Sequence, residues 1–225
     1  MCGITGKIYF DRNHNVEVDE LKRMTNSIIH RGPDDEGHYI NRNVGLGFRR
    51  LSIIDLKTGH QPLSNFDGTI WITFNGEIYN FKELKSDLKK KGYRFKTDTD
   101  TEVIVNLYEE YGENCLGYLR GMFAFVIWDN RKKQLFGARD RFGIKPFYYY
   151  LDAEKFVWGS EIKAINASNG IKKEVDILAL DSYFTYGHIT GSNRSIYNSI
   201  KKLEPAHYFI VKPFESNNIK IQKYW

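Results

Sequence analysis

The chain consists largely of short apolar runs, rich in β-branched and aromatic residues, that are separated by polar turns. Runs of this kind predict β-strands. The predicted strands span residues 4–10, 37–40, 44–48, 70–75, 122–129, 134–139, 147–151 and 155–160. Residues 122–128 are apolar at every position, which predicts burial on both faces of a sheet.

Three other segments carry apolar residues three or four positions apart, the spacing of one helical face. These apolar positions are Val18, Leu21, Met24 and Ile28; Phe81, Leu84 and Leu88; and Ile104, Leu107, Tyr108 and Tyr111. Gly92 and Gly112 follow the second and third segments as stop signals. The stretch Thr99-Asp100-Thr101-Glu102 fits a capping box before the third. Strands in runs with helices between them predict an α+β fold, in which helices cover antiparallel sheets.

The character of the chain changes after Ile165, where residues 166–170 have the composition of a loop. Beyond it the pattern predicts a short helix over 176–183 and strands over 208–211 and 219–224. About 60 residues are too few for an independent core. We therefore expect one domain over residues 1–165, followed by an appendage or connecting segment over 166–225.

Composition and charge narrow the class of protein. The 225 residues are 41% hydrophobic and 27% charged, as in globular proteins, and no run of about 18 apolar residues predicts a membrane span. The net charge of +5 comes from scattered basic residues, whereas nucleic-acid binders concentrate them. Two cysteines make no disulfide framework, no Cys or His spacing indicates a metal site, and no secretory signal is visible. We expect a cytoplasmic protein that binds neither membranes nor nucleic acid.

Cys2 carries the first candidate chemistry. Methionine aminopeptidases remove Met1 when the next side chain is small, which would place a thiol and a free α-amino group on one residue. The ordinary pKa values of these groups, near 8.5 and 7.7–8.0, allow proton exchange between them around neutral pH. Such a residue combines a nucleophile with its own base. The alternative is an inert cysteine near the chain end.

Asn75 and Gly76 carry the second candidate chemistry. They follow an apolar strand, and an Asn amide with an adjacent Gly N–H can donate two hydrogen bonds to a developing oxyanion. The alternative is that Asn-Gly is simply a turn. The stretch Arg139-Asp140-Arg141 is interpreted separately, as a partly buried ion network that supports the sheets.

A set of motifs in one order resembles a known family. The first motifs are Met1-Cys2-Gly3-Ile4, Arg31-Gly32-Pro33-Asp34, Arg50-Leu51-Ser52-Ile53-Ile54-Asp55, Gln61-Pro62-Leu63, Asn75-Gly76-Glu77-Ile78-Tyr79-Asn80 and Asp98-Thr99-Asp100-Thr101-Glu102. The later ones are Gly121-Met122-Phe123-Ala124-Phe125, Ala138-Arg139-Asp140-Arg141-Phe142-Gly143-Ile144-Lys145-Pro146 and Gly159-Ser160-Glu161-Ile162-Lys163-Ala164. Together they resemble the N-terminal glutaminase domain of glutamine-hydrolysing asparagine synthetases, a class II glutamine amidotransferase.

The resemblance implies a fold and a set of roles. The fold would be that of an N-terminal-nucleophile hydrolase, a four-layer αββα sandwich with two stacked antiparallel sheets. Cys2 would attack the side-chain amide of L-glutamine and form a γ-glutamyl thioester, while Asn75 and Gly76 hold the oxyanion. The glutamine-binding residues would be Arg50, Ile53, Asn75, Gly76, Glu77 and Asp100. From the residues alone, Arg50 and Glu77 remain open as surface charges, and Asp100 as a helix cap.

The resemblance also implies partners. It implies no cofactor for the glutaminase domain. No Ser-Gly-Gly-x-Asp-Ser loop for ATP is present, and ATP with Mg²⁺ is therefore expected only in an absent synthetase domain. That domain would lie in the same chain or in a separate subunit and would use the ammonia to amidate aspartate; a homodimer is also expected. The alternatives are an amidotransferase that serves another acceptor and a non-catalytic module that retains the fold.

Overall fold

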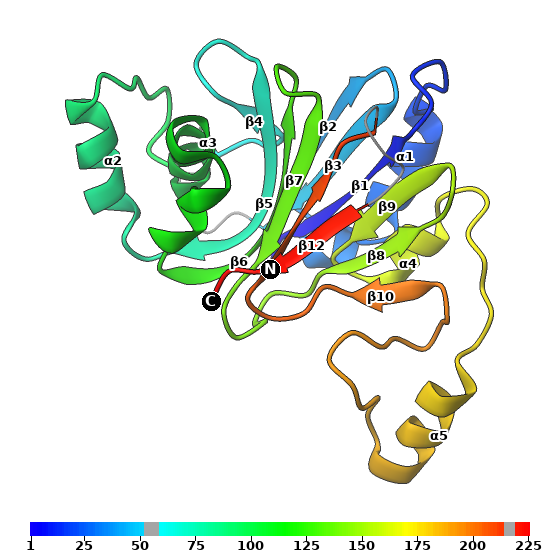
Figure 1. Ribbon diagram of the computed structural model, residues 1–225. Coiled ribbons are helices and arrows are strands. Elements are labelled where there is room, and N and C mark those ends of the chain that lie inside the picture. Colours follow the sequence, from blue (N-terminus) through cyan, green and yellow to red (C-terminus); the bar gives the residue numbers. More distant parts are fainter. Residues whose placement is uncertain (52–58, 214–218) are drawn as a thin grey trace.

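Two six-stranded antiparallel sheets form the body of the protein in a computed structural model, which describes residues 1–51, 59–213 and 219–225 (Figure 1). In order across the sheet, the first contains β10 (Ile200–Lys202), β8 (Tyr148–Leu151), β9 (Lys155–Gly159), β1 (Gly3–Tyr9), β3 (Val44–Arg50) and β2 (Asp35–Asn41). The second contains β12 (Ile219–Lys223), β11 (His207–Val211), β7 (Gln134–Arg139), β6 (Gly121–Asp129), β5 (Ile70–Ile78) and β4 (Leu63–Ser64). Each predicted strand is found within a few residues of its expected bounds.

Strand β6 shows why the sheets stack. Its side chains alternate between two apolar clusters, as successive side chains of a strand point to opposite faces. Phe123, Phe125 and Ile127 pack toward the helices, and Ala124, Val126 and Trp128 pack between the two sheets. The prediction that this run is buried on both faces is confirmed.

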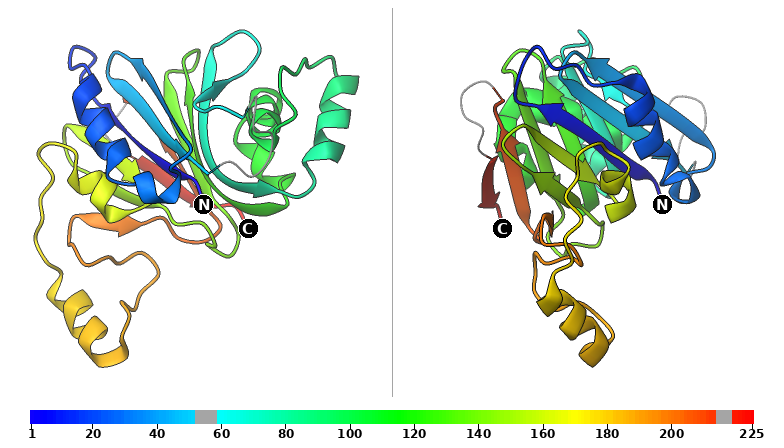
Figure 2. Two further views of the ribbon diagram at one scale, coloured as in Figure 1. Left: turned by 180° about the vertical axis from the view of Figure 1, so that it is seen from behind. Right: turned by 90° about the vertical axis from the view of Figure 1, so that its right-hand side faces the viewer.

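Helices cover the outer face of each sheet. Helix α1 (Val18–Asn26) and helix α4 (Ile162–Asn166) pack on the first sheet, where Met24 and Ile165 share a cluster with Tyr150 and Val157. Helices α2 (Phe81–Lys90) and α3 (Asp100–Tyr111) cover the second sheet. The left view in Figure 2 shows the same order of layers from behind. The predicted four-layer αββα sandwich is confirmed.

The strands that follow residue 165 belong to the sheets. Strand β10 pairs with β8 in the first sheet, while β11 pairs with β7 and β12 with β11 in the second. Leu203, Phe209 and Val211 are buried between the sheets. The expectation that this segment stands outside the core is therefore wrong for β10 to β12. A functional boundary at residue 165 stays a prediction.

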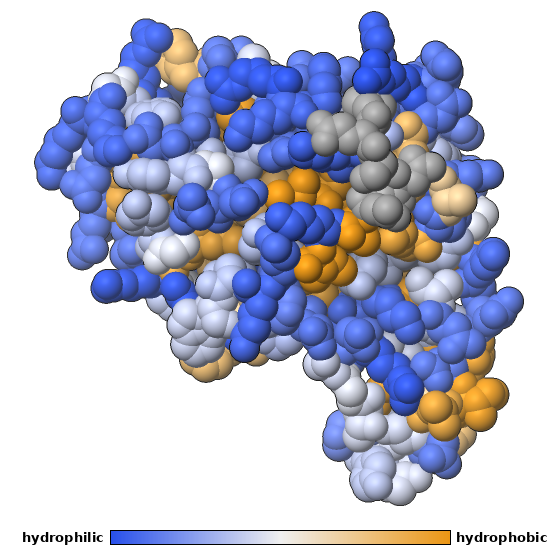
Figure 3. Space-filling model, in the orientation of Figure 1, coloured by the Kyte–Doolittle hydropathy of each residue, from blue (hydrophilic) through white to orange (hydrophobic). Residues whose placement is uncertain are grey.

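Helix α5 (Ile177–Tyr186) projects from the body (Figure 1). Figure 3 shows an apolar patch on one side of this projection, and Phe184 on α5 is 78% exposed. Asp176 caps the helix by accepting hydrogen bonds from the backbone N–H groups of Leu178 and Ala179. Among the helices in the described ranges, none is both long enough and apolar enough to cross a membrane.

A buried ion pair joins β1 to α1, and the sequence analysis missed it. The Lys7 ammonium donates hydrogen bonds to Glu20 Oε1 at 2.6 Å, to the Tyr9 hydroxyl at 2.8 Å and to Ser168 Oγ at 3.1 Å. Lys7 and Glu20 are 0% and 1% exposed. Burial lowers the pKa of Lys7, and the hydrogen bond and charge of Glu20 oppose that shift.

Replacing Glu20 with alanine tests this pair. The change leaves a buried ammonium without its carboxylate, so we expect Glu20→Ala to lower the free energy of unfolding by about 3 kcal/mol or more. Urea denaturation at pH 7 measures the loss. Glu17→Ala, at an exposed position just before α1, serves as the control and should change stability by about 0.5 kcal/mol or less. Equal losses in the two variants would contradict the assignment.

Candidate active site

The candidate site lies where the ends of β1, β3 and β5 meet. The register that pairs Gly3 with Arg49 places Cys2 beside Arg50, at the ends of two interior strands of the first sheet. Asn75 and Gly76 lie on β5 of the second sheet. A pocket opens between these strand ends, near the N-terminus marked in Figure 1. Its lining residues are Cys2, Phe48, Arg50, Leu51, Gly59, Gln61, Phe74, Gly76, Glu77, Thr99, Asp100 and Thr101.

Cys2 is partly buried and held at both its backbone and its side chain. Its sulfur accepts a hydrogen bond from Leu51 N–H at 3.4 Å, and its carbonyl oxygen accepts one from Arg31 Nε at 3.0 Å. Burial raises the pKa of the Cys2 thiol. The Leu51 N–H and the positive charges of the chain's N-terminus, Arg50 and Lys145 act in the opposite direction. The thiol therefore lies in an electropositive corner.

Arg31 holds the start of the chain through an ion-pair cluster. Its Nη1 donates to Glu161 Oε1 at 3.0 Å, and the same oxygen lies 2.8 Å from His30 Nε2. Glu161 directly precedes α4, so this cluster ties the nucleophile to the helix layer.

Asn75 is 1% exposed and lies behind the pocket lining. It stands opposite Ala124 in the β5–β6 ladder, and Ala124 packs between the sheets. Directly opposite residues share a face, so the Asn75 side chain points toward the first sheet, which carries Cys2. Its Nδ2 has no hydrogen-bond partner among the described residues. Buried amides are rarely left in this state, because an unmade hydrogen bond costs free energy.

Gly76 follows on the same strand, and its lack of a side chain is required there. A Cβ at this position would lie 2.2 Å from the carbonyl oxygen of Met122. Any larger residue would therefore push β5 away from β6.

Asp100 brings a carboxylate to the far side of the pocket. It is the first residue of α3, and its Oδ2 accepts a hydrogen bond from Ile78 N–H at 3.0 Å. Burial, with a smaller contribution from the Glu77 charge, raises the pKa of Asp100 to about 6. Thr99 caps the helix instead, by accepting a hydrogen bond from Glu102 N–H. Asp100 remains ionised for the most part at pH 7.

Sequence analysis and structure agree on most of the lining. Cys2, Arg50, Gly76, Glu77 and Asp100 line one pocket, with Asn75 directly behind it. Ile53 lies outside the described residues. The roles of these residues stay predictions.

Two features differ from the sequence interpretation. Gln61 stands in one of the motifs, but the sequence analysis assigned it no role. Its side chain accepts a hydrogen bond from Phe74 N–H at 2.6 Å and donates one to Thr101 Oγ1 at 3.3 Å, which joins β5 to α3 beside the pocket. The expected ion network at Arg139-Asp140-Arg141 is wrong. Arg139 donates to backbone carbonyl oxygens, and Asp140 accepts from backbone N–H groups. The side chains of Arg139 and Asp140 therefore hold backbone segments in place and do not pair with each other.

The chain matches known proteins over its full length. Residues 1–225 match the family of glutamine amidotransferase domains. The glutamine-hydrolysing asparagine synthetase 1 of Bacillus subtilis (strain 168) is 44% identical over 95% of this chain and 34% of its own length. Asparagine synthetase 3 of the same organism is 39% identical over 100% of this chain and 36% of its own length. The chain thus spans about a third of the length of these relatives.

Solved structures share the fold at low identity. The glutamine phosphoribosylpyrophosphate amidotransferase from B. subtilis, complexed with ADP and GMP, has a TM-score of 0.67 at 20% identity. The match covers 100% of this chain and 49% of that one. At this identity the likeness supports the layered architecture alone.

Proposed function

The chain belongs to the family of glutamine amidotransferase domains, and we propose that it hydrolyses the side-chain amide of L-glutamine with Cys2 as the nucleophile. One observation carries the proposal. The buried Nδ2 of Asn75 has no hydrogen-bond partner among the described residues, and the Asn75 side chain points toward the sheet that bears Cys2. An amide donor held ready in this way suits an oxyanion that exists only during the reaction.

The chemistry begins with loss of Met1, which frees the α-amino group of Cys2. The sulfur then forms a bond to the amide carbon of glutamine, and the carbonyl oxygen becomes an oxyanion held by Asn75 Nδ2 and the Gly76 N–H. The α-amine takes the thiol proton, directly or through water, and delivers it to the departing ammonia. Water cleaves the γ-glutamyl thioester, which releases glutamate and restores the thiol.

The pocket offers opposite charges for a zwitterionic substrate. The Arg50 guanidinium can hold the α-carboxylate in a planar, two-point contact. Asp100 and Glu77, across the pocket, take the α-ammonium. A role of the Ile53 backbone in this set stays a prediction from the family motif, because Ile53 lies outside the described residues.

The acceptor of the ammonia is a further proposal. Because the Bacillus subtilis relatives are named asparagine synthetases, we propose aspartate as the acceptor in a synthetase domain of the same chain or of a separate subunit. ATP and Mg²⁺ would be bound there. A homodimer and a cytoplasmic location also stay proposals; the two free thiols, Cys2 and Cys115, suit a reducing compartment.

Glutamate release tests the nucleophile. Wild-type protein, shown by intact mass to have lost Met1, should release glutamate from glutamine, and Cys2→Ala should abolish release because no sulfur remains to attack. Cys115→Ala is the matched control, since Cys115 is fully buried in the helix-side core. Undiminished release by Cys2→Ala would refute the proposal, and inactive, processed wild-type protein would favour a non-catalytic module.

Asn75→Ala tests the oxyanion donor. Loss of one such donor lowers kcat by about 10²–10³, with a much smaller effect on KM, because the contact forms in the transition state. Asn106→Ala controls for burial: Asn106 is also 1% exposed, and its Nδ2 is also unpartnered among the described residues, but it lies within α3. A loss of kcat in Asn106→Ala as large as in Asn75→Ala would show that Asn75 acts through stability alone.

The raised pKa of Asp100 gives a pH dependence of binding. As the pH falls below about 6, the carboxyl group becomes neutral and can no longer pair with the glutamine ammonium. Calorimetric titration of Cys2→Ala with glutamine should therefore show the Kd rising about tenfold per pH unit below that point. The same titration with an added Asp100→Asn should remove this dependence, whereas Asp98→Asn, at an exposed neighbouring site, should retain it. A Kd that is constant between pH 7 and 5 would contradict the assignment.

A further inference from the structure

The loop between β7 and β8, residues 140–146, is held in place by hydrogen bonds that the side chains of Asp140 and Arg139 make. The carboxylate of Asp140 is fully buried and accepts hydrogen bonds from four backbone N–H groups. The donors are Phe123 at 3.2 Å, Phe142 at 3.1 Å, Ile144 at 3.0 Å and Lys145 at 3.0 Å. One carboxylate therefore sets the course of the whole turn.

Arg139 holds the same loop by its carbonyl groups. Its guanidinium donates to the carbonyl oxygens of Lys145 at 2.7 Å, Gly143 at 2.6 Å and Leu203 at 2.6 Å. Gly143 has a φ of +66°, and a Cβ there would lie 2.8 Å from Pro205. Lys145 is thus held at both its N–H and its C=O, which fixes where its side chain begins.

The Lys145 side chain ends at Met1, the residue that precedes Cys2. Lys145 is only 5% exposed, its Nζ lies 3.2 Å from Met1 Sδ, and its positive charge acts on the Cys2 thiol. Loss of Met1 removes the sulfur contact but not the backbone hydrogen bonds that hold Lys145. Among the described residues, no carboxylate lies within salt-bridge distance of it. Burying a cation without a counter-ion is unfavourable, so packing alone does not account for it.

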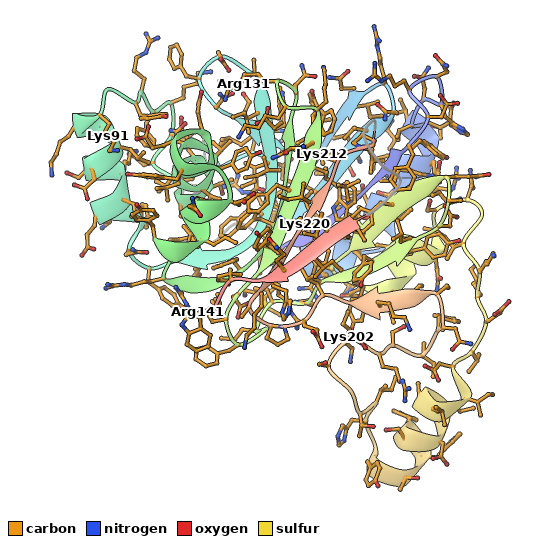
Figure 4. All side chains as sticks on the ribbon, in the orientation of Figure 1. Lys91, Arg131, Arg141, Lys202, Lys212 and Lys220 are labelled. Carbon is orange, nitrogen blue, oxygen red and sulfur yellow. The ribbon has the colours of Figure 1, made fainter. Side chains whose placement is uncertain are left out.

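The charges around Cys2 are mostly positive. They come from the chain's N-terminus at Met1, before β1, from Arg50 on β3, from Lys145 on the 140–146 loop and from Arg31, whose charge is balanced by Glu161. Glu77 and Asp100 lie across the pocket. Figure 4 shows Arg141 and Lys202 at the same end of the molecule. Lys145 and Arg50 are both buried, at 5% and 7% exposed, and Lys145 differs in that Asp140 and Arg139 fix its backbone.

We propose that Lys145 is a positioning residue for the reaction: its fixed positive charge stabilises the Cys2 thiolate and keeps the neighbouring α-amine in its neutral, proton-accepting form. This rests on the proposed function of Cys2. A nearby cation favours both states by Coulomb interaction, and burial strengthens the effect. Removal of the cation should raise the pKa of both the thiol and the α-amine, so that each group loses its proton only at higher pH.

The test follows alkylation of Cys2 by iodoacetamide against pH, in protein shown by intact mass to lack Met1, with the modified residue identified by peptide mass. In Lys145→Met the midpoint of the profile should rise by about one pH unit, which slows alkylation at pH 7 about tenfold. In Lys145→Arg the midpoint should return most of the way to the wild-type value, because arginine also carries a positive charge. Lys89→Met, an exposed lysine on α2, should leave the profile unchanged.

Alkylation needs no glutaminase activity, so failure of this proposal is distinguishable from failure of the proposed function. An unchanged midpoint in Lys145→Met overturns the proposal. A slower reaction at every pH with the same midpoint also overturns it, because that is the signature of a purely structural role. If far-UV circular dichroism shows that Lys145→Met does not fold, Lys145→Gln, which is neutral but polar, decides by the same criteria.

Discussion

The structure depends on the stacking of two sheets whose strand ends meet at one pocket. Sheet pairing brings Cys2 to the first and Asn75 to the second, and the apolar cluster between them fixes their separation. A nucleophile and an oxyanion donor on different sheets cannot be placed by local sequence alone. Side chains of the sandwich core hold this geometry, so catalysis and folding rely on the same contacts.

Burial makes the Cys2 thiol harder to ionise, and the charges of the site offset this effect only in part. A thiol removed from water is harder to ionise, and burial indeed raises the pKa of Cys2. Positive charges from three separate elements oppose this shift. Burial also raises the pKa of Asp100, yet leaves it below neutral pH, so the pocket retains a carboxylate for a cationic group. The site thus combines buried groups, whose hydrogen bonds are strengthened by burial, with positive charges that offset part of the cost of burying the thiol.

Much of the fold follows from sequence periodicity, and the exceptions have physical causes. The pattern predicts β6 because its apolar run is long; β4 and β10 have two and three residues, too few to show a period. In the site, Cys2, Asn75 and Gly76 carry local signals, whereas Arg50, Glu77 and Asp100 are selected only by the family motifs. Gln61 and Lys145 could not be predicted from pattern, because their significance arises from contacts with segments distant in sequence. Lys7 gave a weak signal, because it is a single cation in an apolar strand. Its partner Glu20 lies on α1 and can be identified only from the folded structure.

The most direct measurement is to trap the acyl intermediate. Processed protein mixed with glutamine and quenched in acid within its first turnovers should carry a γ-glutamyl group, detected by intact mass and located on Cys2 by peptide mapping. The adduct should be sensitive to hydroxylamine, as thioesters are. Glutamate formation with no adduct on Cys2, or with the adduct on another residue, would contradict the account.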